Sequence, residues 1–272
     1  MAITDKLAAI GDAIREKTGG TAELTLDQMV TEISGITGGA VGTWDELICG
    51  NTTTYTNDRV TTIGGSAFKD KTFLKEILLS NVKTTNTQAF AKCTGLTTIS
   101  LPRLTNAGDN TFEGCTGLTT ISLPLTTTIG TYCFYNCTGL TNVSLPEVTT
   151  INSRTFMGCS NLVNVDVPLL TSVPLYGFAN CTALSKIDLP VATSVSMYGF
   201  SGCSNLTTLI LRGTSNVATL NATGTFNNTP IASGTGYIYV PDELVEDYKV
   251  ATNWSTYADQ IKPLSEYVEV TE

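Results

Sequence analysis

The chain contains no histidine among its 272 residues. This excludes catalytic sites that pair a serine or cysteine nucleophile with an imidazole base, and it excludes metal sites with imidazole ligands. Charged residues are also few, at 14% of the sequence, where about 25% is usual for a soluble domain. Surface polarity must therefore come from the abundant threonine, serine and asparagine.

Positive charge is scarce, and the net charge of −9 is unevenly placed. Residues 1–40 sum to −3 and residues 236–272 sum to −6, so residues 41–235 are neutral overall. Nucleic acids and anionic membrane surfaces are bound through clustered lysine and arginine side chains. We therefore expect no nucleic-acid partner and no attachment to an anionic membrane surface.

Long apolar runs are missing as well. No run reaches the 18 residues or so that a membrane-spanning helix needs, so we expect no membrane insertion. The opening residues lack the apolar core of a secretory signal. We expect no signal peptide in this chain, either because a signal was removed or because the protein reaches its location by another route.

One stretch, Phe-x-x-Cys-x-x-Leu-x-x-Ile-x-Leu-Pro, is present again and again. Its phenylalanines recur every 22 residues, at Phe68, Phe90, Phe112, Phe134, Phe156, Phe178 and Phe200. A fixed period of this kind indicates a solenoid, in which each copy packs against its neighbours. The apolar spacing at the end of the stretch is that of a strand, so stacked copies should form parallel strands about 4.8 Å apart.

The sequence divides into three parts. Residues 1–40 predict a helical leader, with helices over 3–17 and 26–36 that are too short to be stable alone. They form either a helical hairpin or a module for oligomerisation or docking, and oligomerisation through these helices would make the protein a homo-oligomer. Residues 41–235 predict the solenoid, whose first repeat is degenerate. Residues 236–272 predict a strand and helix that cap its C-terminal end.

The period fails once, after Phe200. The next equivalent residue is Phe226, so four residues are inserted, and we expect them in the loop around residues 213–224. Beyond it, residues 237–241 read as a last strand. Asp242 follows and is a suitable N-cap for the helix of the C-terminal cap.

Cysteine is the residue type with the most apparent chemistry. Six of the eight cysteines share one repeat position, so neighbours should stack about 5 Å apart, within the Cα separation of a disulfide. Free cysteine also suits a small buried apolar position. The alternatives are a reduced buried ladder, disulfides between adjacent repeats, and a metal site. We favour the reduced ladder, with no disulfide, no metal and no cofactor.

The polar positions of the repeated strand are the natural binding surface. They flank the buried isoleucine and form a nearly uncharged ladder without aromatic side chains, which supports glycan binding weakly. The alternative is a plain solvated face. Charge is concentrated at the last four of the candidate binding residues, which are Thr98, Ser100, Thr120, Ser122, Asn142, Ser144, Asn164, Asp166, Lys186 and Asp188.

The sequence contains few candidate catalytic residues. Asp166 and Asp188 lie one repeat apart and would be about 5 Å from each other on adjacent strands, as in a pair of catalytic carboxylates. Two carboxylates on an open strand surface are more simply solvated, with Lys186 as their partner. We therefore assign no catalytic residue and expect that the protein is not an enzyme.

The repeat resembles a known family. The unit at residues 129–146, with Phe134, Cys137 and Leu140 at fixed spacing, is similar to the BspA-type leucine-rich repeat of bacterial surface proteins, over roughly residues 60–235. Residues 238–263 resemble the usual ending of such proteins. The opening, at residues 12–29, resembles short leaders of tail-associated phage and prophage proteins of anaerobic bacteria.

The first resemblance implies a leucine-rich-repeat solenoid and a non-enzymatic surface or adhesion protein. The second implies a component of a virion tail or of host contact. Together they imply an extracellular protein, at a bacterial surface or on a virion, with a protein or a surface glycan of a host cell as partner. A carbohydrate-binding module on the same solenoid is the alternative.

Overall fold

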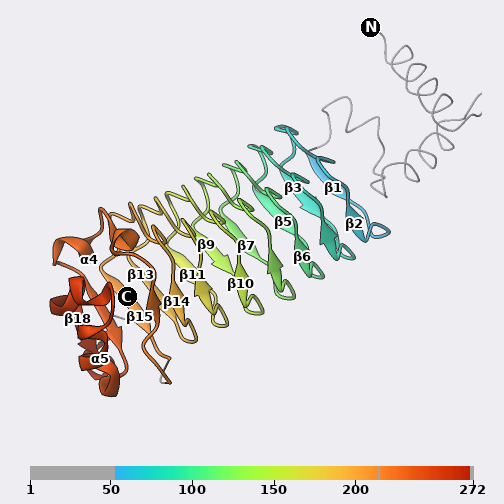
Figure 1. The fold of residues 1–272 in the computed structure, drawn as a ribbon. Helices are drawn as coiled ribbons and strands as arrows, with labels where there is room; N and C mark the ends of the chain where they lie inside the picture. The colour runs from blue at the N-terminus through green and yellow to red at the C-terminus, as the bar shows by residue number, and fades with distance from the viewer. Residues whose placement is uncertain (1–52, 214, 270–272) are drawn as a thin grey trace, which may run out of the picture.

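The computed structural model describes residues 53–213 and 215–269 of the chain, which form an elongated solenoid (Figure 1). The helices expected over 3–17 and 26–36, and any contact between copies that they would make, lie outside the described residues. So do Cys49 and the first part of the degenerate repeat. No helix in the described part of the chain is long and apolar enough to cross a membrane.

A row of parallel strands runs along the solenoid, one strand from each repeat. Equivalent residues lie opposite each other, for example Ile77 and Ile99, as the 22-residue period predicts. The solvent side of this row is called the strand face. The row consists of β1 (Thr54–Thr56), β3 (Glu76–Leu78), β5 (Thr98–Ser100), β7 (Thr120–Ser122), β9 (Asn142–Ser144), β11 (Asn164–Asp166), β13 (Lys186–Leu189), β15 (Thr208–Leu211) and β17 (Tyr237–Val240).

A second row of parallel strands was not predicted. Each of its strands has two residues, which is too short for an alternation of apolar and polar residues to be recognised. It comprises β2 (Thr62–Ile63), β4 (Thr84–Thr85), β6 (Asn106–Ala107), β8 (Thr128–Ile129), β10 (Thr150–Ile151), β12 (Ser172–Val173), β14 (Ser194–Val195) and β16 (Thr219–Leu220). The second residue of each strand is buried, and the first is half-buried or exposed.

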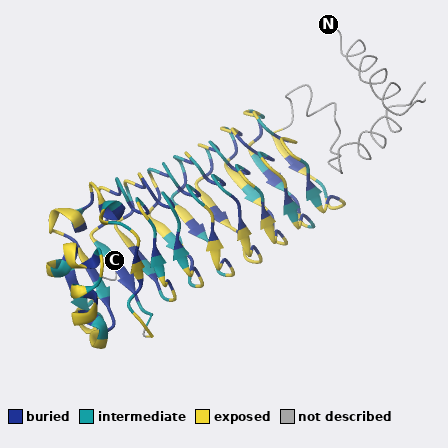
Figure 2. Ribbon diagram, viewed as in Figure 1, coloured by how far each residue is buried: buried dark blue, intermediate teal, exposed yellow. Residues whose placement is uncertain are grey.

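The phenylalanines form one continuous stack through the core. Ring centroids of Phe134 and Phe156 are 5.2 Å apart and their planes differ by 1°. The stack continues to Phe226, whose ring lies 5.9 Å from that of Phe200 although the sequence step is longer. Figure 2 shows the resulting pattern, with buried residues inside every repeat and exposed residues on the turns and strand surfaces.

The insertion after Phe200 lies where the sequence predicts it. The spacing from β15 to β16 is three residues longer than that from β13 to β14, and one more residue lies between β16 and Phe226. Thr219 still pairs with Ser194, and Leu220 with Val195. The extra residues therefore lengthen turns without changing the register.

The turns that follow the phenylalanines contain a residue with left-handed backbone, two positions after the ring. Gly158 and Gly202 illustrate the constraint, with φ of +79° and +77°. A Cβ atom at either residue would lie 2.2 Å from the amide oxygen of the asparagine in the preceding repeat. Alanine would thus be both strained and obstructed at these two positions.

Aperiodic elements follow the last regular repeat. They are η1 (Thr223–Phe226), α4 (Pro230–Ser233), η2 (Asp242–Leu244), α5 (Val245–Val250), η3 (Trp254–Gln260), β18 (Ile261–Pro263) and η4 (Leu264–Glu266). Trp254 is 1% exposed and its indole N–H donates to the carbonyl of Ala218 at 2.6 Å. Its ring centroid lies 6.2 Å from that of Phe226, so it packs on the last phenylalanine of the stack.

The capping role predicted for Asp242 is wrong. The N-cap residue of η2 is Pro241 and that of α5 is Leu244, and neither helix start has a side-chain cap. The carboxylate of Asp242 instead accepts from the N–H of Ser265 at 3.0 Å. It therefore ties the start of η2 to η4, a contact between segments that sequence spacing does not reveal.

Candidate binding site on the strand face

The ten predicted binding residues lie on five successive strands of the same row, from β5 to β13. In each strand they flank the residue whose side chain points into the core. Ser144 and Asp188 are half-buried, and the other eight are exposed. The structure thus brings the predicted residues together on one surface.

The first four residues line a shallow pocket of about 330 Å³. Thr98 and Ser100 come from β5, and Thr120 and Ser122 from β7. The prolines that end these strands, Pro102 and Pro124, form one border of the pocket. Its lining is neutral and carries hydroxyl groups that both donate and accept hydrogen bonds.

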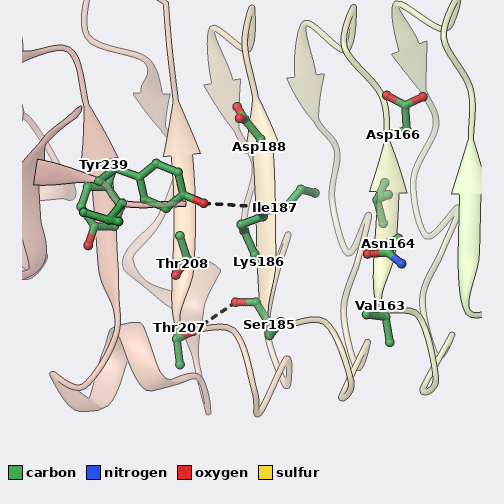
Figure 3. A pocket seen from close by; sticks show the side chains of 13 residues that line it. Val163, Asn164, Asp166, Ser185, Lys186, Ile187, Asp188, Thr207, Thr208 and Tyr239 are labelled. Atoms are coloured by element: carbon green, nitrogen blue, oxygen red, sulfur yellow. Dashed lines mark hydrogen bonds between the residues drawn. The ribbon is translucent and has the colours of Figure 1, made fainter. Parts of the chain in front are cut away.

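The last four residues line a larger open pocket of about 690 Å³ on the same face. Asn164 and Asp166 come from β11, and Lys186 and Asp188 from β13, as Figure 3 shows. Tyr239 of β17 stands beside this ladder. Val163, Val165, Ser185, Ile187, Thr207, Thr208, Tyr267 and Val268 complete the lining.

Asn142 and Ser144 on β9 lie between the two pockets, because β9 pairs with β7 on one side and with β11 on the other. The amide of Asn164 donates to Oδ1 of Asn142 at 2.7 Å. The hydroxyl of Ser144 donates to Oδ2 of Asp166 at 3.1 Å. The ten residues therefore form a continuous polar band along the strand face.

The charges in the larger pocket pair differently from the prediction. Asp188 is bound by Arg212, whose Nε lies 3.0 and 2.9 Å from the two carboxylate oxygens, and whose Nη2 lies 2.7 Å from Oδ2. Asp166 accepts from Ser144. The sequence predicts Lys186 as the partner of both aspartates, and this prediction is wrong. A forked guanidinium suits a carboxylate better than an ammonium does.

Lys186 instead faces the C-terminal residues of the described chain. Its Nζ lies 3.1 Å from Oε1 of Glu269 and donates to the hydroxyl of Tyr267 at 3.3 Å. The hydrogen bonds to Glu269 and to Tyr267 raise the pKa of Lys186 above its usual value. The ring of Tyr267 also lies 5.9 Å from the ammonium group.

The sequence reasoning missed the aromatic wall of this pocket. Tyr239 lies opposite Ile210 of β15 in the strand register, and its ring centroid is 5.1 Å from that of Tyr267. The alternation of residues 237–240 could have identified Tyr239, because β17 pairs with β15, the strand that follows β13 in the row. Tyr267 and Glu269 had no such signal, since they follow an aperiodic segment.

The cysteines of the repeat form a buried ladder that is separate from the strand face. Each of the six thiols in the repeat position donates to the carbonyl of the phenylalanine 25 residues earlier, at 2.9 to 3.2 Å. Burial raises the pKa of Cys93 and of Cys159 to about 12. Since the thiolate is the nucleophile and the metal ligand, these thiols are inert in the folded protein.

The seven cysteines in the described part of the chain are all free and buried. Within residues 53–213 and 215–269, no three cysteine, aspartate or glutamate side chains gather as a metal site would require. The described residues thus offer the hydrogen-bonding and aromatic groups of the strand face as their binding chemistry.

Solved structures with similar folds include leucine-rich repeat proteins of several bacteria. A leucine-rich repeat protein from Bacteroides ovatus is 21% identical, with a TM-score of 0.51, and the match covers 78% of this chain and 65% of that one. A leucine-rich cell surface protein from Faecalibacterium prausnitzii is 20% identical, with a TM-score of 0.41, and the match covers 79% and 64%. This chain thus spans about two-thirds of the length of each. No curated protein sequence matches it.

Two segments match one repeat family. Residues 48–128 and residues 127–236 both match the family described as BspA type leucine-rich repeat region. The matched residues include the smaller pocket, the strands that carry the ten polar residues, and the phenylalanine stack from Phe68 to Phe226. The parallel strands and the conserved 22-residue spacing within the chain agree with this match. The chain belongs to the BspA-type leucine-rich repeat family.

Proposed function

We propose that this protein is a non-enzymatic interaction protein that contacts a macromolecular partner through its strand face. The observation that carries the proposal is the continuous polar band from β5 to β13, with an open pocket at each end. The core positions of the repeat carry nearly the same residue types in every copy. The positions of this band change along the chain, from threonine and serine to asparagine, aspartate and lysine. Variation of this kind gives one scaffold a distinct recognition surface.

The partner in this proposal is a protein or a surface glycan of a host cell. Membership of the BspA-type family supports a location outside the cell, on a bacterial surface. The resemblance of the opening residues to phage and prophage tail proteins supports the virion. In both settings the protein serves adhesion, and its solenoid presents the strand face to the partner.

Catalysis forms no part of the proposal. Asp188 is held by the forked guanidinium of Arg212, and Asp166 accepts a hydrogen bond from Ser144. A general acid and base pair needs two groups whose environments separate their pKa values and that share access to one substrate atom. The separate partners of these two aspartates favour binding over acid and base chemistry.

A carbohydrate-binding module is the second candidate function, and one observation favours it. Tyr239 and Tyr267 form an aromatic wall beside the carboxylate and amide groups of the larger pocket. Aromatic rings provide apolar faces on which the C–H groups of a sugar ring can pack, and tyrosine also offers a hydroxyl. This combination is lacking in the smaller pocket.

The test compares the full chain with Asp166→Ala on a glycan array and in a pull-down of host surface proteins. We expect Asp166→Ala to weaken binding about tenfold or more, because a charged hydrogen-bond acceptor is lost. Asp247→Ala is the matched control, since Asp247 is an exposed aspartate on α5. A glycan that binds in an Asp166-dependent way supports the carbohydrate module. Partners that bind both variants equally would contradict a role for the strand face.

A further inference from the structure

We propose that the larger pocket binds the carboxylate of an acidic sugar at Lys186, and that Glu269 of the chain itself occupies this carboxylate position when no glycan is bound. The inference rests on the proposed role of the strand face in binding, and it names the chemistry of the ligand. It assigns Lys186 and Tyr267 as the carboxylate-binding pair. It assigns Asn164 and Asp166 to the sugar hydroxyl groups.

The first step concerns the ion pair between Lys186 and Glu269. The two side chains are 45% and 68% exposed, and exposed pairs of this kind contribute little free energy. Arg212 and Asp188 differ, because a forked guanidinium contacts both carboxylate oxygens. The pocket therefore contains one fixed pair, at Asp188, and one carboxylate that is easily exchanged, at Lys186.

The second step concerns the donors that surround this exchangeable carboxylate. Lys186 donates to the phenolic oxygen of Tyr267. Because that oxygen accepts from Lys186, its own proton points elsewhere and is available to a ligand. The ammonium group thus contacts both the phenol, at 3.3 Å, and the acceptor position that Glu269 reaches at 3.1 Å. A carboxylate on a ligand fits the same position with a charge-assisted hydrogen bond.

The third step concerns the rest of the ligand. The exposed carboxylate of Asp166 accepts from Ser144 and has further lone pairs that can accept from sugar hydroxyl groups. The ring of Tyr239 lines the same pocket. An acidic peptide would bring several carboxylates close to Asp166 and would be repelled. A single carboxylate on a hydroxyl-rich ring, as in a uronic or sialic acid, meets donors, acceptors and an aromatic wall together.

The size of the pocket agrees with such a ligand. Its volume of about 690 Å³ is within the range of about 300–1,000 Å³ for small-molecule sites. The pocket opens along the strand face toward Asn142 and Ser144, which bond to its Asn164 and Asp166. A longer glycan could therefore continue along the polar band from the acidic sugar.

The first experiment titrates the full chain with N-acetylneuraminic acid and with glucuronic acid, and measures binding by NMR or calorimetry. N-acetylglucosamine and glucose are the neutral probes. We expect at least one acidic sugar to bind at least about tenfold more tightly than the neutral ones. Equal affinities for acidic and neutral sugars, or no binding of either acidic sugar at millimolar concentration, would overturn the inference.

The second experiment tests the two charges. Lys186→Met should weaken binding of the acidic sugar about tenfold or more, and Lys83→Met, at an exposed lysine beside the second strand row, should leave it unchanged. Glu269→Gln should strengthen it about two- to fivefold, because the internal competitor is removed. Glu243→Gln, at an exposed glutamate of η2, is its control. All four substitutions change exposed side chains, and circular dichroism verifies the fold.

The outcomes separate this inference from the proposed function. A glycan or protein whose binding requires Asp166 but tolerates Lys186→Met would refute carboxylate recognition and leave the strand face as the binding surface. A decrease in affinity with Glu269→Gln would show that Glu269 contacts the ligand and does not compete with it. Binding that is indifferent to both Asp166→Ala and Lys186→Met would contradict the inference and the proposed function together.

Discussion

At the scale of single residues, burial in the core disfavours ionisation of the cysteine thiols. Burial raises the pKa of Cys93 and Cys159 to about 12, and it also raises the pKa of Cys115, Cys133, Cys137 and Cys181. Each of these six side chains lies in the hydrophobic core cluster. The cysteines of the repeat position, which resemble a reactive ladder in the sequence, therefore serve as small apolar core residues.

This assignment predicts how the thiols react. In native protein at neutral pH, the seven buried thiols should resist an alkylating reagent, because the side chains are inaccessible. After denaturation without reductant, all eight cysteines of the sequence should react. Thiol titration by absorbance or mass spectrometry measures both states. Fewer than about seven reactive thiols in the denatured protein would instead indicate disulfides between repeats.

The raised pKa values also predict a loss of stability at alkaline pH. In the unfolded chain the thiols ionise near their usual pKa of 9.0, whereas Cys93 and Cys159 stay protonated up to about 12 in the folded protein. The folded state therefore binds more protons between these values. Its free energy of unfolding should fall as pH rises through that window, by roughly 1.4 kcal/mol per pH unit for each such thiol.

Urea unfolding in reductant, between pH 8 and pH 11, measures this dependence. Cys159→Ala is the informative variant, because it removes one titrating thiol. The free energy of unfolding of this variant should fall less steeply with pH, by roughly 1.4 kcal/mol per pH unit. Its lower stability at pH 8 does not affect the comparison, since the slope is the quantity compared. Identical slopes for the wild type and the variant would contradict a thiol origin.

At the scale of structural elements, the phenylalanine stack packs each repeat against its neighbours. Phe134 packs between Phe112 and Phe156, with centroid distances of 5.2 Å to both. We expect Phe134→Ala to lower the free energy of unfolding by about 3–5 kcal/mol, because a fully buried ring is removed and a cavity remains. Phe68→Ala should cost less, because Phe68 belongs to the first full repeat, and end repeats contribute fewer interfaces in a one-dimensional array.

Chemical denaturation of the two variants, followed by far-ultraviolet circular dichroism, tests this order. Both residues are at most 2% exposed, so burial alone predicts equal costs. A larger loss for Phe68→Ala than for Phe134→Ala would contradict the account in which stability builds up from neighbouring repeats.

The elements also differ in how well the sequence predicts them. The strands of the strand face follow from the spacing of residues such as Leu118, Ile121 and Leu123, because every copy repeats it. The second strand row could not be predicted, since two-residue strands carry no periodic signal. The contact of Asp242 with Ser265 was missed because it joins segments that are distant in sequence and outside the repeat.

The candidate site shows the same division. The ten positions of the polar band were predicted from the alternation along each strand, and they share one surface. Arg212, Tyr267 and Glu269 were missed, because their places depend on how the turn after β15 and the C-terminal segment cross the strand face. Periodicity predicts where residues within the repeat lie. The positions of these three residues depend on tertiary contacts, which periodicity does not describe.

The whole molecule separates scaffold from recognition. The interior is a continuous stack of aromatic rings and buried aliphatic side chains from Tyr55 to Ile261. Between the acidic ends, the charges of residues 41–235 sum to zero, so attraction by net charge contributes little to partner choice along the solenoid. Recognition in this account depends on the local chemistry of the strand face and on its two pockets.

The central claim is that the strand face, and not the second strand row, binds the partner. Thr120→Arg and Thr128→Arg test it most directly, because both replace an exposed threonine at the start of a strand in the same repeat. The measurement is the binding of the full chain and of both variants to a glycan array and to host cells. We predict that Thr120→Arg reduces binding at least about tenfold and that Thr128→Arg does not. Loss of binding with Thr128→Arg alone would contradict the account.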